Sequence, residues 1–107
     1  CLTKANKVIN VNLAINYGSH QEILNALKKV KKISRKNFEN NLYTKNIPYP
    51  DILIRTGGRQ RLSNFMLWQL AYTELFFLKK LWPDFTSKDL SNIITKYKKI
   101  KRNFGNV

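Results

Sequence analysis

The sequence predicts an α/β fold in which a parallel β-sheet is flanked by helices. Short apolar runs, several of them rich in β-branched residues, alternate with longer segments whose apolar residues recur at helical spacing. Such alternation favours a parallel sheet, because parallel neighbours are joined by long crossovers that contain helices. The 107 residues show no internal repeat or low-complexity linker, so we expect residues 1–107 to belong to one domain.

The first strand is predicted at 8–15. Valine, isoleucine and leucine nearly alternate there with asparagine, and a period of two places apolar side chains on one face of a strand. The Asn-Tyr-Gly-Ser sequence at 16–19 predicts a turn after this strand.

Two helices are predicted next. The segment 21–33 is amphipathic, with lysines along one face. The apolar residues of its opposite face are Ile23, Leu27 and Val30. The segment 34–42 predicts a second, short helix that carries Phe38. A loop is expected at 43–50.

A second strand is predicted at 51–54, because a short β-branched run follows two prolines there. The glycine pair at 57–58 then predicts a tight turn. The apolar segment 65–70 predicts a buried helix. Ser63 or Asn64, just before it, can cap that helix.

The last part of the chain predicts one more strand and one more helix. The apolar residues between residue 70 and residue 78 predict a buried strand. After the Trp-Pro-Asp-Phe sequence at 82–85, Thr86 and Asp89 form a capping pair that predicts the start of a helix. The apolar positions of this helix are Leu90, Ile93, Ile94, Tyr97 and Ile100.

The loop after 51–54 concentrates groups that bind anions. Arg55 lies at the carboxyl end of the predicted strand, and Arg59 and Arg61 follow closely. Guanidinium groups bind phosphate oxygens in pairs, glycine lets backbone amides approach a ligand, and a helix N-terminus attracts negative charge. The pattern favours a phosphate or diphosphate site. The competing interpretation is a solvated basic loop.

The net charge of +14 comes mostly from scattered lysines. A basic surface attracts nucleic acid, a phosphorylated substrate or the anionic face of a membrane. Abundant lysine and asparagine also arise from mutational bias, and charge runs are commonly solvated helix faces. Both explanations remain open at this point.

Compartment is indicated by cysteine usage and hydropathy. The single cysteine, Cys1, cannot form an internal disulfide, which favours a reducing, cytoplasmic compartment. Lipidation of Cys1 is the alternative. No apolar run reaches the roughly 18 residues that a membrane-spanning helix requires.

Six segments carry a family resemblance. They are Asn-Leu-Ala-Ile-Asn-Tyr-Gly at 12–18, Asp-Ile-Leu-Ile-Arg-Thr-Gly-Gly at 51–58, Arg-Leu-Ser-Asn-Phe-Met-Leu-Trp-Gln at 61–69, Tyr-Thr-Glu-Leu at 72–75, Trp-Pro-Asp-Phe at 82–85 and Phe-Gly at 104–105. Together they resemble the C-terminal half of the cis-prenyltransferases, in particular bacterial isoprenyl transferases of the undecaprenyl diphosphate synthase type. The resemblance implies that residues 1–107 are the C-terminal portion of one cis-prenyltransferase domain.

The resemblance also implies a reaction and a site. The family condenses isopentenyl diphosphate with an allylic diphosphate to make a cis-polyprenyl diphosphate, in this type the precursor of a cell-wall lipid carrier. The positions that match its isopentenyl diphosphate site are Arg55, Arg61, Leu62 and Ser63, with Leu62 contributing backbone only. The resemblance also implies a homodimer and peripheral contact with a membrane. It implies no nucleic-acid partner.

Glu74 matches the family's magnesium-ligating glutamate. Mg²⁺ prefers hard oxygen ligands and is commonly held by one or two carboxylates together with substrate phosphate. The second carboxylate would come from another segment of the enzyme or, in some members, from across a dimer interface. The competing interpretation of Glu74 is a structural ion pair.

The catalytic aspartate of the family is not expected in this part of the protein. It belongs to an N-terminal Asp-Gly-Asn-Gly-Arg-like segment that also carries the allylic diphosphate loop, and the sequence contains no such segment. The site residues named above are therefore binding residues, with no catalytic residue among them. We expect the 107-residue chain to be weakly active or inactive by itself.

Two positions depart from the family pattern. Arg59 stands where the family usually has glutamate, which reverses a charge within the diphosphate loop. Asn103 replaces the second arginine of the usual Arg-Arg-Phe-Gly ending, a region that in many members reaches the partner subunit. The change at Arg59 is expected to alter the ordering of the loop or release from it, and the change at Asn103 puts the contribution of the C-terminal region to diphosphate binding in question.

The aromatic residues have two interpretations. Those at Trp68, Tyr72, Phe76 and Phe77 could line a polyprenyl channel, but burial preferences favour an ordinary core. Trp82 and Phe85 are expected to be packing residues. His20, the only histidine, is expected to be a solvated turn residue.

Two other classes of function compete with the enzyme. A noncatalytic subunit of a heteromeric prenyltransferase would share the fold but usually lacks the diphosphate-binding residues, whereas Arg55, Arg61 and Ser63 are present here. A basic RNA-binding domain would explain the charge but not the ordered match to the family.

Overall fold

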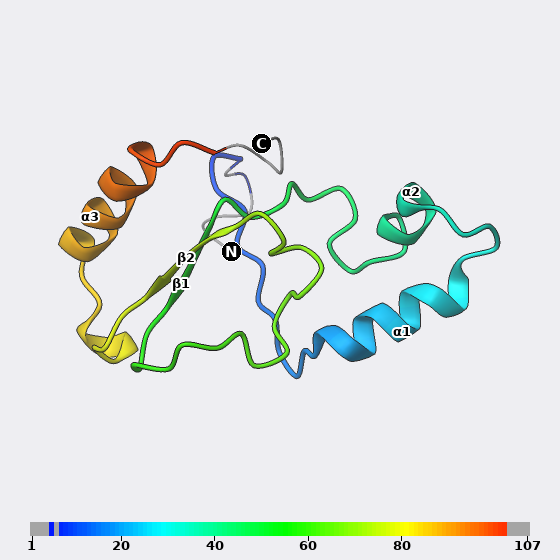
Figure 1. Ribbon diagram of the computed structural model, residues 1–107, viewed down its shortest axis with the longest axis horizontal. Helices are drawn as coiled ribbons and strands as arrows, with labels where there is room; N and C mark the ends of the chain where they lie inside the picture. Colours follow the sequence, from blue (N-terminus) through cyan, green and yellow to red (C-terminus); the bar gives the residue numbers. More distant parts are fainter. Residues whose placement is uncertain (1–4, 6, 103–107) are drawn as a thin grey trace.

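The computed structural model describes residue 5 and residues 7–102. In chain order its elements are α1 (Ser19–Lys29), α2 (Arg35–Glu39), β1 (Ile52–Arg55), β2 (Glu74–Phe77), the 3₁₀ turn η1 (Trp82–Asp84) and α3 (Ser87–Lys98). Figure 1 shows the strand pair between α3 on one side and the α1 and α2 region on the other. This arrangement confirms the predicted α/β fold with a parallel sheet and flanking helices.

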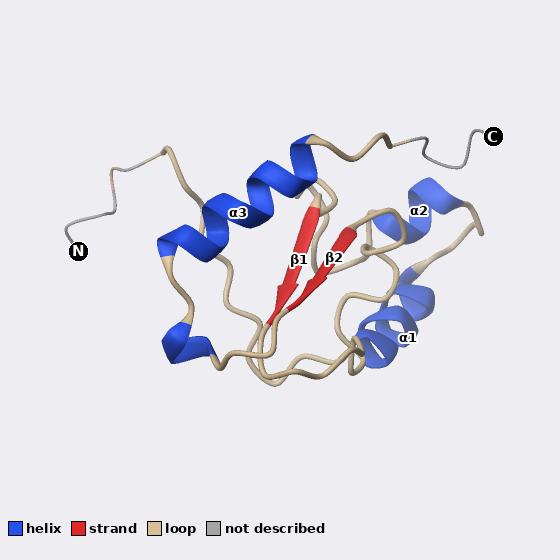
Figure 2. Cartoon of the chain, turned by 60° about the vertical axis from the view of Figure 1, so that its left-hand side comes forward, coloured by secondary structure: helices blue, strands red, loops and turns tan. Residues whose placement is uncertain are grey.

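The two strands are parallel, so both begin at one end of the sheet and finish at the other (Figure 2). Ile52 lies opposite Glu74, and Arg55 lies opposite Phe77. Beyond the ladder, the Leu78 N–H donates to the Arg55 carbonyl over 2.8 Å. The strands therefore confirm the sequence prediction with a shift of one residue in β1, and they place Arg55 at the carboxyl edge.

The strand predicted at 8–15 is wrong for this structure. The segment is extended but has no strand assignment, and its apolar side chains face solvent, with Leu13 80% and Ile15 83% exposed. A strand needs a neighbour to accept and donate its backbone hydrogen bonds. Among the described residues, the sheet consists of β1 and β2 alone, so local propensity at 8–15 has no ladder to join.

The helix predicted at 65–70 is also wrong, although the whole segment lies within the described residues. A series of turns occupies it. Ser63, Asn64 and Met66 have left-handed backbones, with φ of 51°, 61° and 47°, and a right-handed helix cannot continue through such residues. One bond of helical type remains, from the Leu70 N–H to the Met66 carbonyl at 3.0 Å.

Helix α1 begins and ends earlier than the predicted 21–33. Its buried residues are Ser19, Glu22 and Ala26, whereas Leu27 is half exposed. The buried face is therefore rotated toward Glu22. The rotation is possible because the Glu22 carboxylate finds hydrogen-bond partners in the interior, as described below.

A small apolar core joins α1 to α2. It consists of Ala26, Phe38 and Leu42, with Ile23 and Val30 packed against it. The prediction that Phe38 belongs to a short helix is confirmed, although α2 is shorter than 34–42. The Ser34 hydroxyl caps α2 by accepting from the Asn37 N–H at 3.2 Å.

Helix α3 begins with the predicted capping box. The Thr86 hydroxyl accepts from the Asp89 N–H at 3.3 Å, and the Asp89 carboxylate accepts from the Thr86 N–H at 2.8 Å. Ile93 is the buried residue of this helix. Before it, Trp82 stacks on Phe85 with ring centroids 5.5 Å apart, but Trp82 is 70% exposed and contributes little to the core.

Over the described part of the chain, no helix combines the length and apolar character needed to cross a membrane. The predictions for Cys1, Asn103 and 104–105 lie outside the described residues.

Candidate functional site

The turn after β1 is built by the glycine pair. Gly57 and Gly58 have φ of 87° and 70°, a backbone region that side chains other than hydrogen disfavour. Their N–H groups donate to the carbonyls of Lys80 and Leu78, each over 2.8 Å. The predicted tight turn is confirmed. Its amides are engaged by the backbone, however, so the expectation that they approach a ligand is wrong for this structure.

Arg55 organises the rest of the loop. Its Nη1 donates to the Ser63 hydroxyl over 3.0 Å and to the Arg61 carbonyl. The loop therefore folds back on the end of β1, and it brings Arg55, Arg61 and Ser63 together. Leu62 is half-buried between the exposed Arg61 and Ser63.

This arrangement can bind an anion without a helix N-terminus. Arg55 is half-buried and fixed, while Arg59 and Arg61 are exposed on the same loop. Arginine presents a planar fork of donors to phosphate oxygens, and a serine hydroxyl adds one further donor. The sequence argument based on a helix that starts at Ser63 is replaced by an argument based on arginines of one loop that follows the end of a strand.

Glu74 lies at the opposite end of the sheet from Arg55. It is the first residue of β2 and is half-buried, and its N–H donates to the Asp51 carbonyl over 3.0 Å. The three residue steps of the register, at about 3.3 Å each, put Glu74 about 10 Å from Arg55 along the strands. The structure therefore does not bring the predicted metal ligand to the predicted diphosphate site within one chain.

The donor set around Glu74 is too small for a magnesium site built by this part of the chain alone. Within the described part of the chain, no three side chains of histidine, cysteine, aspartate or glutamate gather around a common point. A single carboxylate suits Mg²⁺ only when water and substrate phosphate supply the remaining oxygens. The described residues alone therefore do not supply a ligand set for this site.

Arg102 belongs to the basic C-terminal region but lies away from the loop that carries Arg59 and Arg61. Its guanidinium contacts the Asp51 carboxylate at 2.5 Å and the Tyr97 hydroxyl at 2.7 Å, and it donates to the Tyr72 carbonyl at 2.9 Å. The hydrogen bond from Arg102 lowers the pKa of Asp51. Because Asp51 precedes β1, these contacts join α3 to the edge of the sheet opposite Arg55.

A buried polar cluster was not predicted from the sequence. Glu22 is fully buried, and it accepts hydrogen bonds from the Tyr17 hydroxyl, from the Tyr43 N–H at 2.8 Å and from Gln69 Nε2 at 3.1 Å. Burial, together with the bond to Glu22, raises the pKa of Tyr17 to about 12. The available signal was the four-residue spacing of Glu22 and Ala26, which places both on one helix face.

The contacts of Asn64 were also missed. Its side-chain oxygen accepts from the His20 N–H at 2.9 Å, and its carbonyl accepts from the Ser19 N–H at 2.8 Å. The loop that follows Ser63 is therefore attached to the start of α1. His20 itself is exposed, as predicted, although it lies in α1 rather than in a turn.

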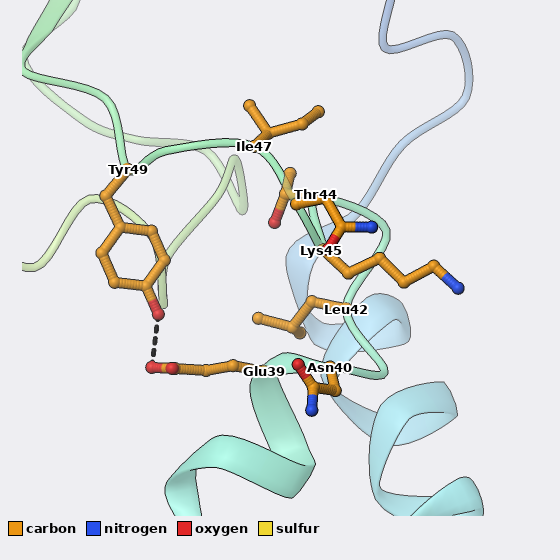
Figure 3. A pocket seen from close by; sticks show the side chains of 8 residues that line it. Glu39, Asn40, Leu42, Thr44, Lys45, Ile47 and Tyr49 are labelled. Atoms are coloured by element: carbon orange, nitrogen blue, oxygen red, sulfur yellow. Dashed lines mark hydrogen bonds between the residues drawn. The ribbon is translucent and has the colours of Figure 1, made fainter.

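A separate pocket of about 250 Å³ lies between α2 and the loop after it. Figure 3 shows the Tyr49 hydroxyl pointing toward Glu39 across this pocket. Glu39 also pairs with Arg35 at 2.7 Å, and this hydrogen bond lowers the pKa of Glu39. Trp68 Nε1 lies 3.3 Å from the same carboxylate. Glu39 and Tyr49 thus bond to each other, and Arg35 and Trp68 supply further partners of Glu39.

The aromatic residues follow the core interpretation only in part. The Trp68 ring packs edge-on against Phe38, with centroids 4.6 Å apart, while its other side is exposed. Tyr72 is exposed as well. Phe76 and Phe77 are half-buried in β2.

Comparisons with known proteins agree on one family. The family model described as "Putative undecaprenyl diphosphate synthase" matches residues 1–105. The isoprenyl transferase of Oceanobacillus iheyensis is 43% identical over 98% of this chain and 46% of its own length. That of Treponema denticola is 52% identical over 88% of this chain and 44% of its own length.

Solved structures give the same result. The crystal structure of "a probable undecaprenyl diphosphate synthase" from Campylobacter jejuni matches with a TM-score of 0.79 at 37% identity, covering 88% of this chain and 46% of that one. Lavandulyl diphosphate synthase from Lavandula x intermedia, solved with dimethylallyl diphosphate, matches with a TM-score of 0.87 at 42% identity, covering 97% and 50%.

The chain spans about half the length of the curated relatives it matches. The match extends over both the α1 and α2 region and the strand pair with its arginine loop. Sequence, fold and relatives therefore agree that this chain belongs to the undecaprenyl diphosphate synthase family of prenyltransferases.

Proposed function

We propose that this chain forms the isopentenyl diphosphate site of a cis-prenyltransferase that makes a polyprenyl diphosphate of the undecaprenyl type. Arg55, Arg61 and Ser63 hold the diphosphate, and the backbone at Leu62 lies between them. The observation that carries the proposal is the pair of bonds from Arg55 Nη1 to Ser63 and to the Arg61 carbonyl. They gather the three residues at the carboxyl edge of a parallel sheet, where α/β folds commonly bind ligands.

The role of these residues is positioning. In this reaction isopentenyl diphosphate keeps its diphosphate, and the allylic substrate loses its own. Groups that bind the retained diphosphate fix the isopentenyl double bond relative to the allylic carbon, and such positioning supplies part of the rate acceleration. The positive loop also offsets the charge of the bound diphosphate.

Magnesium and a second subunit belong to the same proposal. Bound Mg²⁺ would neutralise charge on a departing diphosphate. Glu74 is the proposed ligand, and its partners would come either from another segment of the enzyme or from a second copy in a homodimer. Peripheral contact of the assembled enzyme with a membrane would be favoured by the net charge of +14.

Isothermal titration of the 107-residue chain with isopentenyl diphosphate tests the site. Arg61→Ala should weaken binding about 10- to 100-fold, because a hydrogen bond to a charged group contributes about 1.5–3 kcal/mol. Arg59→Ala is the matched control, since it removes the same charge from the same exposed loop. It should change the affinity less than about threefold, as expected for screened electrostatics.

Equal weakening by both variants would mean that the loop attracts anions without a built site. Titration with structured RNA over a range of salt concentrations separates the nucleic-acid alternative. Counterion release makes RNA affinity fall steeply with salt, so RNA binding that is tighter than diphosphate binding at physiological salt would contradict the proposal.

An activity assay tests whether the 107-residue chain catalyses the reaction by itself. The purified chain is incubated with radiolabelled isopentenyl diphosphate and farnesyl diphosphate, with Mg²⁺ present. We expect no long-chain product, because the sequence contains no Asp-Gly-Asn-Gly-Arg-like segment to supply the catalytic aspartate. Long-chain product would show that these residues suffice for the reaction and would contradict this expectation.

A further inference from the structure

The start of α1 lacks a capping side chain of its own. Its N-cap residue is Gly18, which forms no side-chain cap bond. The first N–H groups of a helix have no partner within the helix and need one from outside. Asn64 supplies it: the Ser19 N–H donates to the Asn64 carbonyl at 2.8 Å, and the His20 N–H donates to the Asn64 side-chain oxygen at 2.9 Å. A residue of the arginine loop thus caps a helix that precedes it by 44 positions.

The attachment is reciprocal. The Ser19 hydroxyl accepts from the Leu67 N–H at 3.0 Å, and Ser19 is fully buried. One turn further along α1, Glu22 accepts from Gln69 Nε2 at 3.1 Å. The first turn of α1 therefore holds the segment from 64 to 69 at three points.

Gly18 allows the close approach that these bonds require. A Cβ at residue 18 would lie 3.0 Å from Nδ2 of Asn64, which is tighter than ordinary van der Waals contact. The backbone of Gly18 is extended, with φ of −143°, so its conformation does not demand glycine. The requirement is space for the Asn64 side chain.

Asn64 also fixes the geometry of its neighbour Ser63. Ser63 and Asn64 both have left-handed backbones, with φ of 51° and 61°. Asparagine tolerates this region better than most residues, and serine does not share that tolerance. The two bonds that Asn64 accepts from α1 hold the pair in this conformation, and it is in this conformation that the Ser63 hydroxyl accepts from Arg55 Nη1 at 3.0 Å.

We propose that Asn64 is a positioning residue for diphosphate binding: by capping α1 it locks Ser63 beside Arg55. This inference rests on the proposed function, since it names what orders the same site. Asn64 touches no substrate in this scheme and acts through Ser63.

Three variants of the 107-residue chain separate this role from general stability. Asn64→Gly keeps the left-handed backbone and the carbonyl but removes the side-chain cap. Asn64→Asp keeps an oxygen that can accept from the His20 N–H. Ser34→Ala is the matched control, because it removes the side-chain cap of α2 and leaves the arginine loop untouched.

Binding of inorganic diphosphate is measured by titration calorimetry, and folding is followed by circular dichroism and urea unfolding. We expect Asn64→Gly to weaken diphosphate binding at least fivefold and Asn64→Asp to weaken it less. Ser34→Ala should lose stability but keep an affinity within twofold of the unchanged chain. An affinity of Asn64→Gly equal to that of the Ser34→Ala control would overturn the inference.

A second measurement does not depend on ligand. Amide hydrogen exchange at His20 should accelerate at least tenfold in Asn64→Gly and remain slow in Ser34→Ala and in Asn64→Asp. Unchanged exchange at His20 would overturn the cap itself. If Arg61→Ala and the unchanged chain bind diphosphate equally while His20 exchange responds as expected, the proposed function fails and the cap stands.

Discussion

Of the first two segments predicted as strands, only the second forms a strand. Residues 8–15 and β1 are both rich in valine, isoleucine and leucine. β1 pairs in register with β2 and is half-buried along its length. The segment 8–15 is extended and exposes its apolar side chains, with Val8 94% exposed.

The difference lies in the neighbours and not in the local propensity. A strand is stabilised by cross-strand hydrogen bonds and side-chain pairs. For β1 these come from β2, which the turn at the glycine pair and the following crossover bring alongside it. Among the described residues, nothing pairs with 8–15. The comparison teaches that a segment with high strand propensity forms a strand only where the rest of the fold provides a neighbouring strand.

The largest expected effect comes from placing a charge in each segment. Ile54→Asp in β1 puts a carboxylate in a half-buried ladder position opposite Phe76, and we expect a loss of about 2–4 kcal/mol in the free energy of unfolding. Leu13→Asp is the matched change in 8–15 and should alter it by less than about 0.5 kcal/mol. Urea unfolding of both variants measures the contrast. Equal losses would show that 8–15 is paired in solution.

Glu22 holds Tyr17, which follows the segment 8–15, against the folded region. Glu22→Ala leaves the Tyr17 hydroxyl, the Tyr43 N–H and Gln69 without their buried acceptor, and should cost about 2–3 kcal/mol. Glu39→Ala removes a carboxylate of the surface pocket and should cost about 1 kcal/mol or less. Thermal unfolding of the two variants gives the comparison. A smaller loss for Glu22→Ala than for Glu39→Ala would contradict the assignment of Glu22 as the buried anchor.

The turn that distinguishes β1 from 8–15 can be tested by its glycine. In Gly58→Ala the added Cβ meets Lys79 atoms only at 3.9 Å, so the expected loss of about 1–2 kcal/mol comes from the left-handed backbone. Asn16→Gly is the reverse substitution, because it introduces glycine at the left-handed residue that follows 8–15. It should change stability by less than about 0.5 kcal/mol. Chemical denaturation detects both, and a neutral Gly58→Ala would mean that the turn rearranges without cost.

The smallest expected effect concerns pH and the helix beside β1. The hydrogen bond from Lys80, with those from Thr86, lowers the pKa of Asp89 to about 2 from its ordinary value of 3.8. Because the folded-state pKa is depressed, this contribution to stability is complete above about pH 4 and is lost as pH falls toward about 2.

Thermal unfolding between pH 5 and pH 2 measures this effect in the chain and in Asp89→Asn. The unchanged chain should lose more stability over this range than Asp89→Asn, which has no carboxylate to protonate. Parallel pH profiles for the two proteins would mean that the Lys80–Asp89 ion pair does not contribute to folding stability.

Local patterns were sufficient for some elements because the information is local. The capping pair Thr86 and Asp89 is three residues apart and forms as predicted. The apolar run of β1, the left-handed turn at the glycine pair and the placement of Arg55 at a strand end also follow from short stretches of sequence. The gathering of Arg55 with Ser63 was predicted only through the resemblance to a family, since eight positions separate them.

The rest required the tertiary structure, because the deciding partners are far apart in sequence. Asn64 looks like the cap of the helix that would follow it, yet it caps α1. The turns it occupies then replace the predicted helix at 65–70. Glu22 looks like a solvated helix residue until Tyr43 and Gln69 supply buried donors.

The sequence by itself determined the fold class, the family and the residues proposed to bind a diphosphate, since each depends on residue type and spacing. Only the tertiary structure decided that 8–15 has no strand partner among the described residues, that Glu74 lies at the far end of the sheet from Arg55, and that the loop carrying Ser63 is anchored on α1. Hydrogen-bond partners across tens of residues settle such questions, and a local pattern contains no information about them.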